Sequence, residues 1–189
     1  MKRFFDFFIV LLVLLIFISG CTTKKPSTSD RRSDEKTQTT QETSPPVKPD
    51  HKNRVVVYYA DSDALYLHPF EFELPAGSNA IEFILEKLFE SKAPEGYLNT
   101  VPEYMSKPKV NVEVDTAFVD FTSRDIEFYP KGSTGENLFI YSIVNSLTES
   151  LGVKYVVFTV DGKRRAIDGS NYDFSTQQFE FHKESVATK

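Results

Sequence analysis

Cysteine is almost absent from this chain, because Cys21 is the only one among 189 residues. A single cysteine cannot form a disulfide within the chain, so the folded part must be held together by its core alone. His51, His68 and His182 are the only histidines, and none lies three or four residues from another. The sequence therefore predicts no disulfide framework, no metal site and no cofactor.

A long hydrophobic run is missing as well. The longest apolar stretch, residues 7–18, has twelve residues, whereas a helix that spans a bilayer needs about twenty. Lys2 and Arg3 precede this stretch, and the small residues Ser19 and Gly20 follow it. A basic start, a short apolar run and small residues before the cut are typical of a secretory signal, so residues 1–20 are predicted to be a signal peptide.

Ile18, Ser19, Gly20 and Cys21 resemble the lipobox of bacterial lipoproteins, in which an aliphatic residue and two small residues precede the cysteine. This resemblance implies cleavage between Gly20 and Cys21 and a diacylglycerol on the sulfur of Cys21. Two acyl chains anchor a protein stably to a bilayer. The expected location is the extracytoplasmic side of the cell membrane. A plain secretory signal, or a signal anchor with an incidental cysteine, is the alternative.

Aliphatic residues are scarce in residues 21–53, where Val47 is the only one. Such a segment cannot bury enough apolar surface to offset its ordering entropy, so it is predicted to be a disordered tether. Residues 54–189 carry thirteen Lys or Arg against twenty-one Asp or Glu, a net charge of −8. This acidic charge argues against binding to nucleic acid and against lying flat on anionic lipid.

The remainder is long enough for one domain, predicted at 54–182 with a C-terminal tail at 183–189. Its pattern has no Rossmann-type alternation and predicts the order β-β-α-β-β-α-β-β. We therefore expect an α+β fold, a compact two-layer sandwich with two helices on one face of a mixed β-sheet. The six strands of this order are expected at 54–60, 65–73, 109–114, 117–121, 153–160 and 164–167, with 178–182 as a candidate last edge strand and residues 96–108 as a connector.

The two expected helices have clear ends. Ser78 and Ser133 are good N-cap residues, and Gly152 is suited to end the second helix. Two tight hairpins are expected, at Asp115–Thr116 and at Asp161–Gly162. The second helix has an apolar face, and its opposite, polar face carries Ser142, Asn145, Ser146 and Glu149.

The chain contains no strong sequence motif of a catalytic or ligand-binding site. No Gly-x-Ser-x-Gly motif occurs, and the calcium-like start at Asp61–Asp63 lacks the glycine and glutamate that would complete a loop. Residues 132–135 precede a helix and could meet an anion there, but a helix cap is the simpler interpretation. Asp120, Glu149 and Asp161 could act as acid and base only if the fold paired them. We predict no catalytic residues and no enzyme activity.

The chain is rich in aromatic residues, with seventeen Phe and nine Tyr but no Trp. Most are expected in the core. Phe83, Leu138 and Phe139 fall off the main apolar stripes of their helices, and exposed apolar groups of that kind can mark a contact surface. Packing against loops is the alternative for these three residues.

Five segments together resemble the GerMN domain of sporulation and spore-germination lipoproteins, namely 55–63, 101–103, 112–121, 145–149 and 152–162. The last two are the most specific, with an Asn-Ser-Leu-Thr-Glu helix end before a strand that finishes in Asp-Gly. The middle departs from the family pattern at Tyr104 and Thr116, where glycine is usual. The resemblance covers nearly the whole folded part in one copy.

This resemblance implies a fold akin to the ring-building motif of envelope-spanning sporulation complexes. Family members are membrane-anchored and non-enzymatic, so the expected partners are the membrane and envelope proteins, including further copies of the chain. The basic residues 163–165 could also contact peptidoglycan or another acidic wall polymer. Two other functions stay open: a lipoprotein that binds a small solute or wall fragment, and a wall-acting hydrolase, which would need a carboxylate pair in a cleft.

Overall fold

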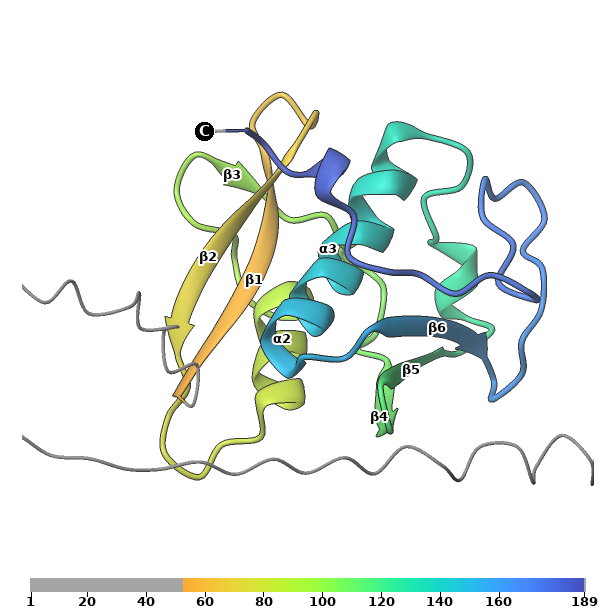
Figure 1. Cartoon of the computed structure of the whole chain (residues 1–189). Helices are drawn as coiled ribbons and strands as arrows, with labels where there is room; N and C mark the ends of the chain where they lie inside the picture. The colour runs from red at the N-terminus through yellow and green to blue at the C-terminus, as the bar shows by residue number, and fades with distance from the viewer. Residues whose placement is uncertain (1–52, 189) are drawn as a thin grey trace, which may run out of the picture. The chain divides into compact units, whose positions relative to one another are not determined.

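The computed structural model describes residues 53–188, which form two three-stranded sheets with two α-helices (Figure 1). The predicted signal peptide and residues 21–52 of the predicted tether lie outside the described residues. The elements follow in the order β1 (Arg54–Asp61), β2 (Leu67–Glu73), α2 (Ala80–Phe89), β3 (Tyr97–Leu98), β4 (Lys109–Glu113), β5 (Thr116–Phe121), α3 (Thr134–Leu151) and β6 (Tyr155–Val160), with short 3-10 helices η3 (Asp125–Glu127) and η4 (Lys183–Ser185).

The first sheet has the order β2-β1-β3, and both pairings are antiparallel. Its central strand β1 is buried on both faces, as its run of β-branched and aromatic residues predicts. Val55, Val57 and Tyr59 face the main core, whereas Val56 and Tyr58 belong to a second, smaller apolar cluster. Strand β3 lies in the stretch expected to be only a connector.

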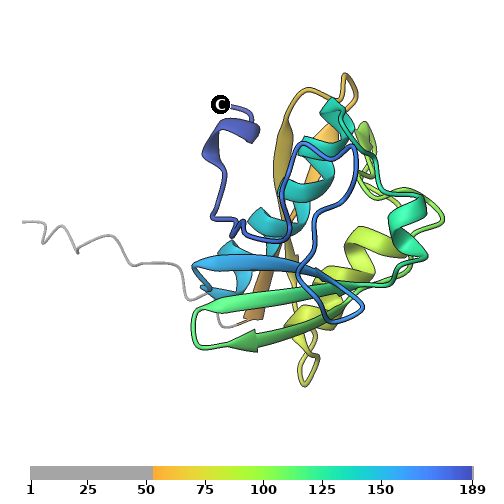
Figure 2. The ribbon, with the colours of Figure 1, turned by 90° about the vertical axis from the view of Figure 1, so that its right-hand side faces the viewer.

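The second sheet has the order β4-β5-β6. Strands β4 and β5 form an antiparallel hairpin, and β5 and β6 are parallel because α3 connects them. Glu113 pairs with Thr116, so the two hairpin residues are Val114 and Asp115, one position earlier than predicted. Figure 2 shows β4 on the side of this sheet that faces away from α3.

Helix α3 runs through the middle of the fold and contacts β1, β6 and α2 (Figure 1). It begins as predicted at the N-cap Ser133 and ends at Gly152, which has a φ of 70°. This left-handed conformation costs glycine little. Helix α2 begins one residue later than predicted, because the Asn79 side chain, not Ser78, accepts bonds from the amides of Ile81 and Glu82.

Most of the polar face of α3 is covered by other elements and does not point to solvent. The Ser150 hydroxyl accepts a bond from the amide of Val56 at 2.8 Å and donates to its carbonyl at 3.0 Å. The Ser146 hydroxyl accepts from the amide of Tyr58 at 3.0 Å. Strand β3 reaches only Ala60 and Asp61 of this edge, so two serines of a helix take the place of a strand partner along the rest of β1.

The α+β class is confirmed, and the sheet arrangement differs from the expected single mixed sheet. Residues 164–167 and 178–182 do not form strands. Lys163, just before the first of these regions, forms one isolated bridge with Val160, and Phe179 in the second forms one with Val156. The turn at Asp161–Gly162 forms as predicted, with both residues at positive φ. None of the helices in residues 53–188 is both long enough and apolar enough to cross a bilayer.

Candidate interaction surfaces

Gly20 and Cys21, the predicted cleavage and lipidation residues, lie outside the described part of the chain and stay predictions. The predicted contact surface is wrong for Leu138 and Phe139, which are 3% and 0% exposed. Leu138 packs in the second cluster against β1, and Phe139 packs against aromatic rings of the main core. Because α3 is covered on several sides, a residue off its main apolar stripe is still buried.

Phe83 is also not a free surface residue. It is half-buried, and its ring lies 6.4 Å from that of Phe72 on β2. The Lys87 ammonium lies 5.1 Å from the Phe83 ring centre and 5.3 Å from the Phe72 ring centre. Phe83 therefore joins α2 to a strand of the first sheet, whereas the alternative stated for it was packing against loops.

Other apolar side chains are exposed in its place, in three groups and at Phe181 of the C-terminal segment. Leu65, Tyr66 and Leu98 belong to one end of the first sheet, where the β1–β2 turn lies near β3. Tyr104 is 73% exposed and its ring contacts that of Phe128. Val112 and Val114, on the β4–β5 hairpin, form the third group. Sequence periodicity could not identify these residues, because the turn residues follow no regular pattern and the alternation of β4 would place Val112 on the core face.

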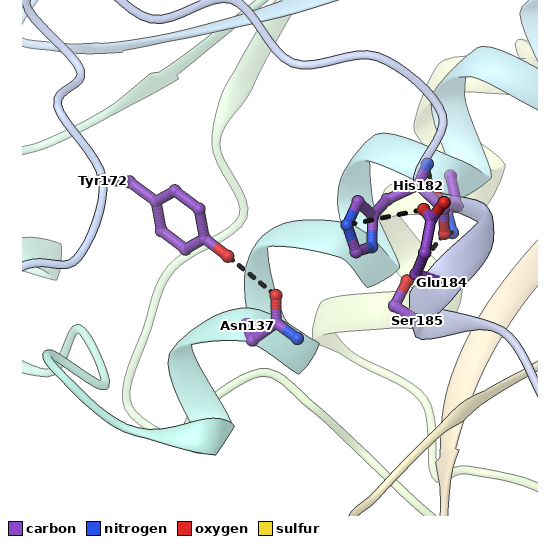
Figure 3. A network of polar contacts seen from close by, with 6 residues as sticks. Asn137, Tyr172, His182, Glu184 and Ser185 are labelled. Carbon is purple, nitrogen blue, oxygen red and sulfur yellow. Dashed lines mark hydrogen bonds and ion pairs between the residues drawn. The ribbon is translucent and has the colours of Figure 1, made fainter.

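A polar and aromatic cluster joins α3 to the C-terminal segment (Figure 3). The Tyr172 hydroxyl donates to Asn137 at 2.7 Å, and the His182 ring stacks on Tyr141 with centres 4.0 Å apart. The same His182 ring has its Nε2 atom 3.7 Å from Glu184. The cluster holds the chain after residue 171 onto the helix.

The backbone of His182 is fixed by one side chain of α3. The Asn145 amide accepts a bond from the His182 N–H at 2.8 Å and donates to its carbonyl at 3.2 Å. Asn145 is fully buried, although it lies on the polar face of α3. Asn145 is the first residue of the Asn-Ser-Leu-Thr-Glu helix end. Its side chain binds the backbone of the C-terminal segment as a neighbouring strand would.

Glu136 provides a buried carboxylate at the start of α3. It accepts bonds from the amide of Gly132 at 2.8 Å, the amide of Asn171 at 3.0 Å and the hydroxyl of Ser170 at 2.5 Å. Burial raises the pKa of Glu136, but these hydrogen bonds outweigh it, so the pKa lies below its usual value. The helix cap at residues 132–135 is therefore filled by the chain's own carboxylate.

The carboxylates considered for catalysis are each held by separate structural bonds. Asp120 accepts from the Thr159 hydroxyl at 2.6 Å and the Gly162 amide at 2.7 Å. Asp161 is bound by Ser123, and Glu149 by the Tyr58 hydroxyl. Burial, together with the bond to Glu149 and its charge, raises the pKa of Tyr58. The three carboxylates thus do not form one acid–base pair.

Nucleophilic and metal arrangements were the other chemistry considered. The Ser185 hydroxyl donates to the backbone carbonyl of His182 and not to its ring (Figure 3). Asp61 accepts bonds from the amides of Leu65 and Tyr66, so it closes the β1–β2 turn. Among residues 53–188, no three His, Cys, Asp or Glu side chains gather closely enough to hold a metal ion.

One open hollow lies between the end of α3 and the C-terminal segment. It has a volume of about 460 Å³ and combines apolar and charged side chains. The residues that line it are Thr148, Glu149, Val153, Lys154, Glu180 and Phe181. This mixture fits a small polar ligand with an apolar part, and Phe181 is 42% exposed at its rim.

Comparison with known families identifies the domain. Residues 56–166 match the family model described as Germane, sporulation and spore germination. The matched region is more than half of the chain. The chain belongs to the Germane family. Its GerMN resemblance is thereby confirmed, and the α3–β6 junction that carries the most specific segment lies inside the matched residues. No curated protein matches the chain.

Two solved structures share the fold of this Germane domain. The tandem GerMN domains of the sporulation protein GerM from Bacillus subtilis have 20% identity and a TM-score of 0.51, and the alignment covers 64% of this chain and 44% of that one. The first GerMN domain of the same protein has 18% identity and a TM-score of 0.52, with coverages of 69% and 98%. The chain thus spans less than half of the tandem structure and nearly all of the single domain.

Proposed function

We propose that this Germane-family protein is a lipid-anchored, extracytoplasmic and non-catalytic module that assembles a cell-envelope complex in sporulation or spore germination. Family membership carries the proposal, because the matched family is described by these two processes. The residues Ile18 to Cys21 support the lipid anchor, and the polar composition of residues 22–53 supports a tether between the anchor and the domain.

A non-catalytic role is supported by what the polar side chains do. The buried carboxylates of Asp125 and Glu136 bind backbone amides and hydroxyls of their own domain. The partners of the module are then envelope proteins that contact its surface. A purified protein that cleaves peptidoglycan would contradict this part of the proposal.

The anchor is tested by replacing Cys21 with alanine in the organism that encodes the protein. We expect Cys21→Ala to move the protein out of the lipid-modified membrane fraction and to reduce sporulation or germination without slowing growth. Ser19→Ala is the matched control, because it keeps a small residue and the cysteine and should leave the anchor unchanged. A free Cys21 thiol in the mature wild-type protein, detected by mass spectrometry, would contradict the proposal.

A second candidate function is the binding of a small solute or wall fragment, which the hollow beside Glu149 and Lys154 favours. It predicts that muropeptides raise the melting temperature of the protein. Lys154→Ala should remove that shift if the ligand is acidic. An unchanged melting temperature across muropeptides and sugars would rule out this candidate for the ligands tried.

A further inference from the structure

The outer edge of β4 is the open edge of the second sheet. The two-residue hairpin makes Glu113 and Thr116 a hydrogen-bonded pair, so Lys109, Asn111 and Glu113 direct their backbone groups toward β5. The backbone N–H and C=O groups of Val110 and Val112 therefore point outward. No other described residue forms a backbone hydrogen bond with either of them.

The outer edge of β2, in contrast, is protected. It contains Pro69, which has no N–H to donate, and its exposed side chains Glu71 and Glu73 have the same charge. Its first residue, Leu67, already accepts a bond from the Ala187 amide at 3.0 Å. Proline and like charges on an edge strand discourage pairing with another chain.

The sequence of β4 is complementary to itself when two copies run antiparallel. It reads Lys-Val-Asn-Val-Glu, so pairing centred on Asn111 places Lys109 opposite Glu113 of the second copy, and the reverse. Val110 then faces Val112 of the second copy. Opposite charges and β-branched residues directly across an antiparallel pair are favourable, whereas like charges are not.

This register also matches the hydrogen-bonding groups. The outward-pointing residues Val110 and Val112 become the hydrogen-bonded pairs, and Asn111 faces its own copy as a non-hydrogen-bonded pair, where side chains lie closest. Lys109, Asn111 and Glu113 are exposed, and no described residue forms an ion pair with Lys109 or Glu113. The charges are therefore available to a second chain.

We propose that β4 is a self-pairing edge, through which two copies of this protein join their second sheets into one six-stranded sheet about a two-fold axis at Asn111. Val112, which is 37% exposed and has Ala117 as its partner on β5, gains Val110 of the second copy as an apolar neighbour on its open side. The pairing deepens the proposed assembly role by naming one partner surface. It does not need the lipid anchor, although an anchor would raise the local concentration of the copies.

Disulfide trapping tests the register in the full chain. We use Cys21→Ser as the background, in detergent, so that each introduced cysteine is the only thiol and the result does not depend on lipidation. Asn111→Cys should form a disulfide dimer under mild oxidation, because facing residues of a non-hydrogen-bonded pair have the Cα separation that a disulfide needs. Glu113→Cys alone should not, but mixed with Lys109→Cys it should.

The exposed β2 position Glu73→Cys measures random collision. We expect about tenfold more dimer from Asn111→Cys than from this control, since pairing raises the effective concentration of the two thiols. Equal yields at positions 73 and 111, or a Glu113→Cys dimer as abundant as the Asn111→Cys dimer, would overturn the proposal.

Charge reversal tests the complementarity. Lys109→Glu changes both ion pairs of the symmetric dimer into like-charge pairs, so trapping through Asn111→Cys should fall by about tenfold. Adding Glu113→Lys to the same chain restores opposite charges and should restore the dimer. A double reversal that stays monomeric, or a single reversal with no effect, would overturn the proposal. Either result would leave the Cys21 test of the proposed function unaffected.

Discussion

The two sheets of this domain treat their edges differently. In the first sheet, β1 has β2 on one side and, on the other, β3 followed by Ser146 and Ser150 of α3. In the second sheet, β5 and β6 are central to the core, while β4 leaves its outer groups open. The difference shows that one helix can complete a sheet with hydroxyl groups, while the other sheet is left with an edge that has charges of both signs.

Serine suits this role because its side chain is short. A helix that lies close to a strand needs small residues at the contact, and hydroxyls four positions apart lie on the same face of the helix. Ser142 extends the same row, with its hydroxyl 2.6 Å from that of Thr100 in the segment after β3. The row therefore joins α3 to both β1 and the β3 region.

The largest effect is expected from breaking the completed edge of β1. Ser146→Ala together with Ser150→Ala would leave the amides of Val56 and Tyr58 without partners in a buried region. Each unpaired buried group costs about 1–3 kcal/mol, so we expect the free energy of unfolding to fall by about 2–4 kcal/mol. Chemical denaturation measures this loss.

Ser62→Ala is the control for that experiment, because Ser62 is an exposed turn residue. Its free energy of unfolding should stay within about 0.5 kcal/mol of the wild type. A double variant as stable as this control would mean that water or a shift of the helix replaces the two hydroxyls. The open edge of β1 would then not depend on Ser146 and Ser150.

A smaller effect is expected from the link between α3 and the chain that follows the second sheet. Glu136→Gln keeps the shape but brings an NH₂ group to amides and a hydroxyl that need acceptors. We expect a loss of about 2 kcal/mol near neutral pH. Glu127→Gln, at an exposed carboxylate in η3, is the matched control and should change little.

The pH dependence of this loss of stability tests whether Glu136 is charged in the folded state. The Glu136 pKa is lowered below 4.5 in the folded state, so its stabilisation is fully present above that pH and is lost as the pH falls through the folded-state pKa. The difference between wild type and Glu136→Gln should therefore shrink in acid. A difference that stays constant from pH 7 to pH 3 would contradict a charged, hydrogen-bonded carboxylate.

The smallest effect is expected at the tip of the second sheet. Val114 has a φ of 56° and is fully exposed, which is unfavourable for a β-branched residue. Val114→Asn should raise the free energy of unfolding by about 0.5–1 kcal/mol, because asparagine tolerates this conformation. Val112→Asn, on the strand itself, should lower it. Thermal unfolding of both variants is measured at low protein concentration, where copies do not pair through β4. The result then reports the backbone strain at residue 114 separately from the pairing of copies.

The sequence predicts the elements that local rules determine. Ser133 and Gly152 bound α3 because a cap and a left-handed residue depend only on neighbours along the chain. The β-branched run at β6 likewise forms its strand. Gly152 and β6 lie within the most specific family segments, so the resemblance and the physical patterns agree there.

Tertiary packing determines what the sequence does not predict. Serine and asparagine on α3 look like solvent residues until β1 and residue 182 are brought against them. Leu138 looks exposed for the same reason. The expected strand at 178–182 makes only one bridge, because Asn145 binds the backbone of His182 in place of a neighbouring strand.

The segment after β6 has a consequence for biogenesis. Phe179 pairs with Val156 in the second sheet, and the Ala187 amide bonds to Leu67 in the first. These residues leave the ribosome after the strands of both sheets. A chain cut before Phe179 would leave the backbone of Val156 and Leu67 without these partners, so both sheets are closed only once this segment has been made.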